Sequence, residues 1–291
     1  MTNSNFEAYQ GILLLSSEAS VLKEFEHILG CPVPHVGTEI TWSVFGFNAQ
    51  DKHVTGLGLE AQGLKSLPET IGNLTQLQKL YLNDNNLSSL PESFYQLKNL
   101  KELDLGGNFF KSFPESFGQL TELLYLNLSF NVIESLPNSF YRLENLRELI
   151  LTDNKFKSLP ESFGQLLSLT ELDLASNDLE VLPESFSNLK NLEELLLYDS
   201  SLNSLPENIG NLTRLRTLCI FDNQLSSLPE SFNNLKNLRM LDLGCNRLNS
   251  LPESFNKLDN LKTLKLYENP LTQAEKKKIT RSFKKQCVVV L

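Results

Sequence analysis

The chain has 291 residues, of which 41% are hydrophobic and 21% are charged, a composition that excludes an intrinsically disordered or a fibrous protein. The formal net charge at pH 7 is −9, which disfavours nucleic acid as a partner. The three histidines, His27, His35 and His53, all lie in the first fifth of the chain, so the rest of the sequence offers no imidazole for catalysis.

Residues 1–53 are predicted to form an N-terminal cap made of a helix and a strand. The helix is expected to end at Gly30 as its C-cap and to bury one apolar face, made of Val21, Leu22, Phe25, Ile28 and Leu29. A strand is then predicted through Trp42, Val44, Phe45 and Phe47. It turns at Asn48–Lys52 into the first repeat strand at Val54.

The sequence gives weak indications of location. The early apolar cluster Gly11–Leu15 is too short for a membrane span, and no basic residue precedes it, so we expect no secretory signal. The four cysteines, Cys31, Cys219, Cys245 and Cys287, have neither CxxC nor metal-ligand spacing. We therefore expect a cytoplasmic protein with reduced thiols.

A repeat of 23 residues occupies three quarters of the chain. Prolines recur without insertion or deletion at 68, 91, 114, 137, 160, 183, 206, 229 and 252. The unit around them, clearest from Leu100 to Leu120, reads LxxLxLxxNxLxxLPxxxxxLxx, and ten copies fill residues 54–271. This unit resembles the leucine-rich repeat family, and its LPxxIxxL form is similar to the intracellular Ras-group and the bacterial and archaeal members.

The resemblance implies an α/β fold: a right-handed leucine-rich-repeat solenoid, or horseshoe, with a concave parallel sheet and short helical or 3-10 turns on its convex side. The pattern within each unit agrees, because alternating leucines such as Leu103 and Leu105 point inward and the residue between them points outward. One unit cannot bury its leucines alone and needs neighbours on both sides.

Three columns of the repeat have predicted structural roles. Asparagines at 85, 108, 131, 154, 177, 223, 246 and 269 are expected to satisfy buried backbone groups of their own turn and the next, and Gln62 and Ser200 depart from this column. A buried spine is predicted from Phe94, Phe117, Phe140, Phe163, Phe186, Phe232 and Phe255, with Ile71 and Ile209. The recurring Ser66-Leu67-Pro68-Glu69 motif is interpreted as a capping box on a short helical turn.

Residues 272–291 are predicted to form a C-terminal cap. Thr272 and Glu275 form a capping box that opens a helix, Ile279 and Phe283 share its apolar stripe, and Cys287–Leu291 forms an edge strand. The helix is basic, with Lys276, Lys277, Lys278, Arg281, Lys284 and Lys285. These residues suit a nuclear signal or an anchor to an anionic surface, but a solvated lid is favoured.

The outward positions of the strands are predicted to carry the function. Four outward columns hold thirteen acids and two bases, Lys79 and Lys265. The acids are Glu60, Asp84, Glu102, Asp104, Glu148, Asp153, Glu171, Asp173, Glu194, Asp199, Asp222, Asp242 and Glu268. A flanking column is basic, with Lys101, Arg147, Arg216, Arg239 and Lys262 against Glu193.

Exposed aromatic residues beside charges are typical of interface anchors. The predicted protein-binding residues of the concave face are Tyr81, Asp104, Tyr125, Asn127, Phe130, Glu148, Ile150, Glu171, Asp173, Glu194, Leu196, Tyr198, Phe221, Asp242 and Tyr267. The alternative interpretation is that the aromatic residues serve sheet packing and the acids serve solubility.

A second regularity has a period of three repeats, because Asp104, Asp173 and Asp242 share one strand position. They either form three acidic notches that suit a periodic basic partner or are a relic of duplicating a three-repeat block, and the relic is favoured.

No motif indicates an enzyme, a metal site or a cofactor site: the chain has no calcium loop, GxGxxG, Walker loop or GxSxG. We therefore expect a non-catalytic protein-interaction scaffold, with a signalling role, whose acidic face binds a basic or amphipathic protein surface. A small GTPase is conceivable as the partner only through the family resemblance. The alternatives are a recognition module for peptides or glycans at a cell surface, or a structural spacer.

Overall fold

The computed structural model describes residues 5–283 and 287–291. The chain divides into two compact units, Met1–Leu146 and Arg147–Leu291, which are described separately. The predicted basic residues Lys284 and Lys285 lie outside the described residues.

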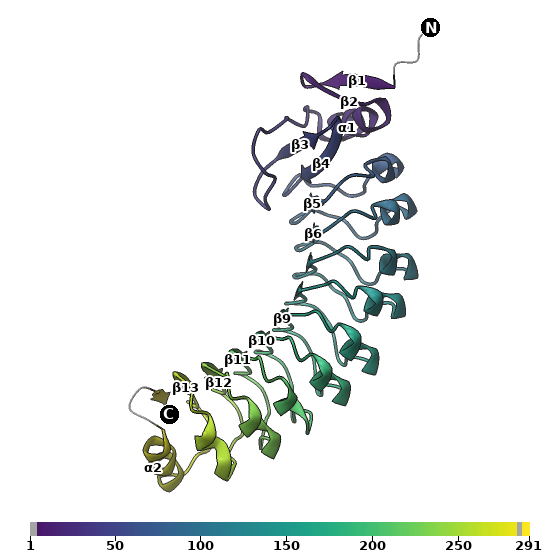
Figure 1. Cartoon of the computed structure of the whole chain (residues 1–291). Coiled ribbons are helices and arrows are strands. Elements are labelled where there is room, and N and C mark those ends of the chain that lie inside the picture. The colour runs from purple at the N-terminus through teal and green to yellow at the C-terminus, as the bar shows by residue number, and fades with distance from the viewer. Residues whose placement is uncertain (1–4, 284–286) are drawn as a thin grey trace. The chain divides into compact units, whose positions relative to one another are not determined.

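The first unit begins with a hairpin and a helix (Figure 1). Strands β1 (Phe6–Tyr9) and β2 (Ile12–Leu15) pair antiparallel, and α1 (Ser16–Leu29) follows directly. The predicted helix is confirmed, including its C-cap, because Gly30 has a left-handed backbone and donates its amide hydrogen to Glu26 O. Val21, Leu22 and Phe25 are buried, whereas the predicted burial of Ile28 is wrong, since it is 48% exposed.

A second pair of strands leads into the repeats. Strand β3 (Gly46–Gln50) pairs antiparallel with β4 (His53–Gly58), with a bulge at Asn48/Ala49. The predicted strand is therefore misplaced, because Trp42, Val44 and Phe45 precede β3. The helix α1 is fixed to this pair by Glu18, whose buried carboxylate accepts hydrogen bonds from Val54 N at 2.6 Å and contacts His53 Nδ1 at 2.8 Å.

The repeats of the first unit stack with a constant register. Strand β4 pairs in parallel with β5, β5 with β6 and β6 with β7, and the central leucines of these strands, Leu57, Leu80, Leu103 and Leu126, are aligned. The strands are β5 (Lys79–Tyr81), β6 (Glu102–Asp104) and β7 (Tyr125–Asn127). A 3-10 turn follows each strand, at η1 (Glu69–Asn73), η2 (Glu92–Gln96), η3 (Glu115–Gln119) and η4 (Asn138–Arg142).

The second unit continues the same pattern. Its parallel strands are β8 (Glu148–Ile150), β9 (Glu171–Asp173), β10 (Glu194–Leu196), β11 (Thr217–Cys219), β12 (Met240–Asp242), β13 (Thr263–Lys265) and β14 (Val288–Val290). Its 3-10 turns are η5 (Glu161–Gln165), η6 (Glu184–Asn188), η7 (Ile209–Asn211), η8 (Glu230–Asn234) and η9 (Glu253–Lys257). In each unit the turns lie on the side of the coil opposite the strands (Figure 1).

The two predicted buried columns are confirmed. All nine residues of the Phe/Ile spine are at most 3% exposed. The asparagines of the other column are buried, and Asn85 bridges two repeats: its side-chain amide donates to Leu59 O at 2.8 Å and Leu82 O at 2.9 Å, and its oxygen accepts from Leu64 N at 2.9 Å. The bridge runs to the preceding repeat rather than to the next one.

The predicted capping box within each turn is wrong. The turns that carry the motif begin at Glu with Pro as the N-cap, as at Pro68 and Glu69, except η7, which begins at Ile209 with Asn208 as its N-cap. In both cases the serine two residues before Pro lies outside the turn. The glutamate instead caps the turn of the next repeat. The Glu115 carboxylate accepts hydrogen bonds from Asn138 N at 3.1 Å and Ser139 N at 2.8 Å, and these backbone amides lower its pKa.

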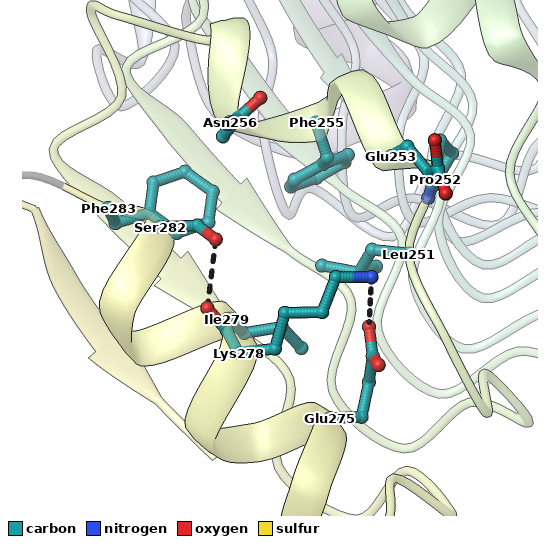
Figure 2. A pocket seen from close by; sticks show the side chains of 10 residues that line it. All are labelled: Leu251, Pro252, Glu253, Phe255, Asn256, Glu275, Lys278, Ile279, Ser282 and Phe283. Carbon is teal, nitrogen blue, oxygen red and sulfur yellow. Dashed lines mark hydrogen bonds and ion pairs between the residues drawn. The ribbon is translucent and has the colours of Figure 1, made fainter.

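The predicted C-terminal cap elements are present. Helix α2 (Gln273–Ser282) begins after Thr272, whose hydroxyl accepts a hydrogen bond from Glu275 N at 3.1 Å, and β14 pairs in parallel with β13. Figure 2 shows Ile279 and Phe283 of this end of the chain facing Leu251 and Phe255. The space between them is about 30 Å³, enough for a water molecule but too small for an organic ligand.

Candidate functional site

The candidate site is the strand face, which we define as the outward positions of β4–β7 in the first unit and of β8–β13 in the second, together with the outward residues that follow each strand. Each repeat strand points its central leucine into the core, as with Leu172 and Leu195, so the residues on either side of it face outward. Parallel strands lie about 4.8 Å apart, so outward residues of equal register form columns.

The start of this face in the first unit is covered by residues 31–45. A Cβ on Gly58 would lie 1.9 Å from Val44 O, and one on Gly56 would lie 3.0 Å from Ile40 Cγ1, so only glycine lets this segment cross β4. Lys79 pairs with Glu39 of the segment and, at 2.8 Å, with Glu102. One of the two predicted bases of the face is thus already neutralised.

Three predicted contact residues are buried, and their expected exposure is wrong. Tyr81 is 7% exposed, because its hydroxyl donates a hydrogen bond to Glu102 and its ring packs into the face. Asp104 and Asp242 are 4% and 3% exposed. Burial raises the pKa of Asp104. Asp242 pairs with Lys265 at 2.9 Å, which neutralises the second predicted base.

The aspartates of the three-repeat regularity have a shared structural role. Asp104 accepts a hydrogen bond from Gly106 N at 2.8 Å, Asp173 from Ala175 N at 2.9 Å, and Asp242 from Gly244 N at 3.1 Å. Each carboxylate therefore holds the backbone of its own turn two residues ahead, as Asx turns do. This role explains the aspartates without a periodic partner.

The five outward acids that directly precede a residue of the asparagine column, or Ser200 in its place, also have a backbone explanation. We call this column, from Asn85 to Asn269, the asparagine ladder. Asp84, Asp153, Asp199, Asp222 and Glu268 all have positive φ, between 54° and 57°. Aspartate tolerates this left-handed conformation better than most residues. Phe130 occupies the same position with φ of 52° and is 60% exposed, whereas Tyr125 and Asn127 beside it are half-buried.

In the second unit, four carboxylates gather around an open hollow of about 180 Å³. Glu148, Glu171 and Glu194 are aligned on β8, β9 and β10, and Asp173 lies beside them. Ile150 and Leu196 line the same hollow, so we call it the carboxylate hollow. Among the described residues, its lining includes no lysine or arginine. Burial, and then the charges of Glu171 and Asp173, raise the pKa of Glu194.

An aromatic row lies at the C-terminal ends of the strands of this unit. The rings of Tyr198 and Phe221 stack with centroids 4.8 Å apart and an angle of 4° between their planes. Tyr267 lies over Gly244, since a Cβ there would meet its ring at 2.3 Å. These three rings, the aromatic row, are half-buried and keep one side toward solvent.

The structure thus brings together part of the predicted site. Glu148, Ile150, Glu171, Asp173, Glu194 and Leu196 form the carboxylate hollow, and Tyr198, Phe221 and Tyr267 form the aromatic row. The sequence analysis missed a second asparagine column before the strands, in which Asn145, Asn191 and Asn237 donate to backbone oxygens 24 residues earlier. Its regular spacing was available as a signal.

Two further features concern other classes of function. No cluster of three or more His, Cys, Asp or Glu side chains among the described residues could hold a metal ion. No helix in that part of the chain is long and apolar enough to cross a membrane.

Family models match most of the repeat array. A leucine-rich repeat region model matches residues 111–222, a two-copy leucine-rich repeat model matches residues 75–117, and a further leucine-rich repeat model matches residues 213–271. The chain is also 52% identical over 52 residues to the disease resistance-like protein DSC1 of Arabidopsis thaliana. That match covers 18% of this chain and spans only 4% of the length of that protein.

Solved structures give the same assignment. A leucine-rich repeat protein of Leptospira interrogans is 31% identical, with a TM-score of 0.59, over 81% of this chain and 72% of that one. The protein TLR13 in its complex with ssRNA13 is 35% identical, with a TM-score of 0.66, over 74% of this chain and 32% of that one. A TDR receptor is 33% identical, with a TM-score of 0.61, over 75% of this chain and 44% of that one.

These matches confirm the predicted α/β leucine-rich-repeat fold class. Domains of this class generally recognise proteins or other ligands and are generally non-catalytic binding modules. The repeat motif, the strand and 3-10 geometry of both units and the similarity to solved structures agree, and the chain belongs to the leucine-rich repeat family.

Proposed function

We propose that this chain is a non-catalytic, cytoplasmic protein-interaction scaffold whose strand face in the second unit binds a basic or amphipathic segment of a protein partner. The observation that carries the proposal is the carboxylate hollow, in which four acids surround a space of about 180 Å³ that is also lined by Ile150 and Leu196. We expect a lysine or arginine side chain of the partner to enter it.

The composition of the hollow suits such a side chain. Lysine and arginine combine an apolar stem with a charged head. The stem can pack against Ile150 and Leu196, while the head donates charge-assisted hydrogen bonds to the carboxylates of Glu171 and Glu194. A bound cation would also relieve the repulsion between carboxylates that contributes to the raised pKa of Glu194.

The aromatic row supplies the apolar part of the proposed interface. Tyrosine and phenylalanine are rigid side chains with a large contact area, and they are enriched among residues that dominate binding energy. Tyr198 and Phe221 are already ordered by stacking, so little conformational entropy is lost when a partner covers them. An amphipathic segment can contact the row and the hollow together, because Tyr198 and Leu196 belong to the same repeat.

A selection experiment tests this proposal. We would select binders to the full-length protein from a random peptide library at low salt and expect the enriched peptides to combine lysine or arginine with apolar residues. Their affinity should fall between about 50 and 500 mM NaCl because salt screens the attraction.

The E171K/E194K variant should lose these peptides. The matched control E180K/E207K changes the same charge at two exposed positions of the same unit and should keep them. Enriched peptides that lack basic residues, or that bind E171K/E194K as well as wild type, would refute the proposal.

A further inference from the structure

A basic hollow in the second unit is separate from the carboxylate hollow. Arg214, Arg216, Arg239 and Lys262, which we call the basic margin, line an open space of about 500 Å³ together with Glu193, Asn237 and Asn260. Arg216, Arg239 and Lys262 directly precede the first residues of β11, β12 and β13. Four cations here face a single carboxylate.

The backbone stacks three of these cations, Arg216, Arg239 and Lys262, in one column. Arg239 N donates to Arg216 O at 2.8 Å, and Lys262 N donates to Arg239 O at 2.8 Å, so successive side chains start about 4.8 Å apart, the spacing of adjacent strands. Arg216 pairs with Glu193 at 2.9 Å, and Arg214 donates to the Asn191 side-chain oxygen at 2.9 Å. Within the described residues, Arg239 and Lys262 have no ion-pair partner.

Stacked like charges repel each other, and an anion placed between them removes that cost. Guanidinium groups bind planar anions such as carboxylates through two parallel hydrogen bonds. The basic margin therefore has the charge, the donors and the space to hold anionic groups.

The two asparagines narrow the class of ligand. The side-chain amide nitrogens of Asn237 and Asn260 donate to Thr213 O and Lys236 O, both at 2.8 Å, so their oxygens are the atoms that can accept hydrogen bonds from a ligand. A peptide supplies backbone N–H donors together with acidic side chains and so matches both features. A DNA backbone supplies no hydrogen-bond donors and an RNA backbone supplies only its 2′-hydroxyls, and either would also approach the carboxylates of the neighbouring strand face.

We infer that the basic margin is a binding site for an acidic segment of a protein. This inference rests on the proposed function where it assigns both sites to one partner. That partner presents a basic segment to the carboxylate hollow and an acidic segment to the basic margin. Two sites of opposite charge on one unit fix the orientation of a bound chain, since the reversed orientation places like charges together.

The test uses the full-length protein and two labelled peptides, hexaglutamate and hexalysine, with binding followed by fluorescence anisotropy at low salt. Hexaglutamate should bind wild type, and R239E/K262E should weaken that binding by about tenfold or more. The control K155E/K157E makes the same charge change at two exposed positions of the unit and should change the affinity by less than about twofold. Circular dichroism establishes that each variant is folded.

The outcomes separate the two proposals. The inference is overturned if hexaglutamate does not bind the wild-type protein, because the basic margin then attracts no acidic peptide. It is also overturned if K155E/K157E weakens the binding of hexaglutamate as much as R239E/K262E does, because the attraction then comes from the overall charge of the protein. Tighter binding of hexauridylate RNA than of hexaglutamate, lost in R239E/K262E, overturns the peptide assignment. Hexalysine that binds E171K/E194K as well as wild type counts against the proposed function and leaves the basic margin intact.

Discussion

Phe130 combines a left-handed backbone conformation with a large exposed ring. Neither feature stabilises a surface turn. For a bulky residue this conformation costs about 1–2 kcal/mol, whereas asparagine adopts it more readily. Residues held in such conformations are candidates for function. We therefore still predict that the Phe130 ring contacts a protein partner, and its backbone conformation lowers the stability of the first unit.

We expect Phe130→Asn to stabilise the protein by about 1 kcal/mol because the strain is relieved. Phe109→Asn is the matched control: Phe109 is 56% exposed and lacks a positive φ, so its replacement should change stability by less than about 0.5 kcal/mol. Chemical denaturation measures both. A gain from Phe109→Asn equal to that from Phe130→Asn would show that lost apolar exposure, not the backbone, is the cause.

Two glutamates should affect the pH dependence of stability in opposite directions. The Ser139 backbone amide contributes most to the lowered pKa of Glu115, so this residue stabilises the fold above the ordinary glutamate range, and the contribution is lost as pH falls through the lowered pKa. Glu115→Gln should therefore be less stable than wild type at pH 7, with the difference disappearing in acid. Chemical denaturation of both proteins at a series of pH values tests this prediction. A stability difference between Glu115→Gln and wild type that persists in acid would contradict it.

Glu194 should change the pH dependence of stability in the opposite direction. Burial and neighbouring acids raise its pKa, so its ionisation on going from low to neutral pH costs stability. Glu194→Gln should be more stable than wild type at pH 7, by about 0.2–1 kcal/mol as for relief of a like-charge pair across strands, and equal to it below the ordinary glutamate pKa. The same pH series measures this difference. A destabilised variant at pH 7 would mean that the carboxylate has a favourable partner in the fold.

Among the turns of the second unit, the one after β10 has serine in place of the ladder asparagine. Ser200 stands in the place of asparagine, and its buried hydroxyl has no hydrogen-bond partner among the described residues. In the preceding repeat, Asn177 donates to Leu151 O and Leu174 O at 3.0 Å and accepts from Phe156 N at 3.1 Å. The ladder therefore ties each such turn to the repeat before it.

Ser200→Asn should restore this tie and stabilise the protein by about 1–2 kcal/mol, since each buried hydrogen bond contributes about 0.5–1.5 kcal/mol. Asn177→Ser, the reverse change one repeat earlier, should destabilise it by about 1–3 kcal/mol. Urea denaturation of the two variants checks the pair. If Asn177→Ser destabilises while Ser200→Asn brings no gain, the turn after β10 has a geometry that the ladder cannot use.

Features set by spacing along the chain were predictable. The strands, the asparagine ladder, the Phe spine and the start of α2 all follow from periods and caps that the sequence displays. The hairpin β1–β2 was missed because its strands have four residues each and its turn, Gln10–Gly11, carries no strong signal. The crossing of β4 was missed too, although Gly56 and Gly58 stand where other repeats carry side chains.

The candidate site was predicted less well than the fold, because burial depends on neighbours in adjacent repeats. Tyr81, Asp104 and Asp242 occupy outward positions, yet Glu102, Asn127 and Lys265 from the next strand cover or bind them. The hollow and the basic margin each require several repeats in register, which one repeat read alone does not reveal. Comparing equivalent positions of successive repeats identified the charges of the two sites, but it did not show how deeply each side chain is buried.

At the scale of the whole molecule, each unit has an outer side of 3-10 turns and a strand face, and most of the outward acids in the first unit already have partners or turn roles. In the second unit the carboxylate hollow and the aromatic row stand open on the strand face. The central claim is that this face, rather than the outer side, holds the partner.

Photo-crosslinking tests that claim directly. A benzophenone side chain is placed at Phe221 on the strand face or, in the control, at Val181, which is 45% exposed and lies between β9 and η6. Each protein is irradiated with a library-selected peptide. We predict cross-links from position 221 that disappear in E171K/E194K, and none from position 181. Cross-links from position 181 alone would place the binding surface elsewhere and contradict the claim.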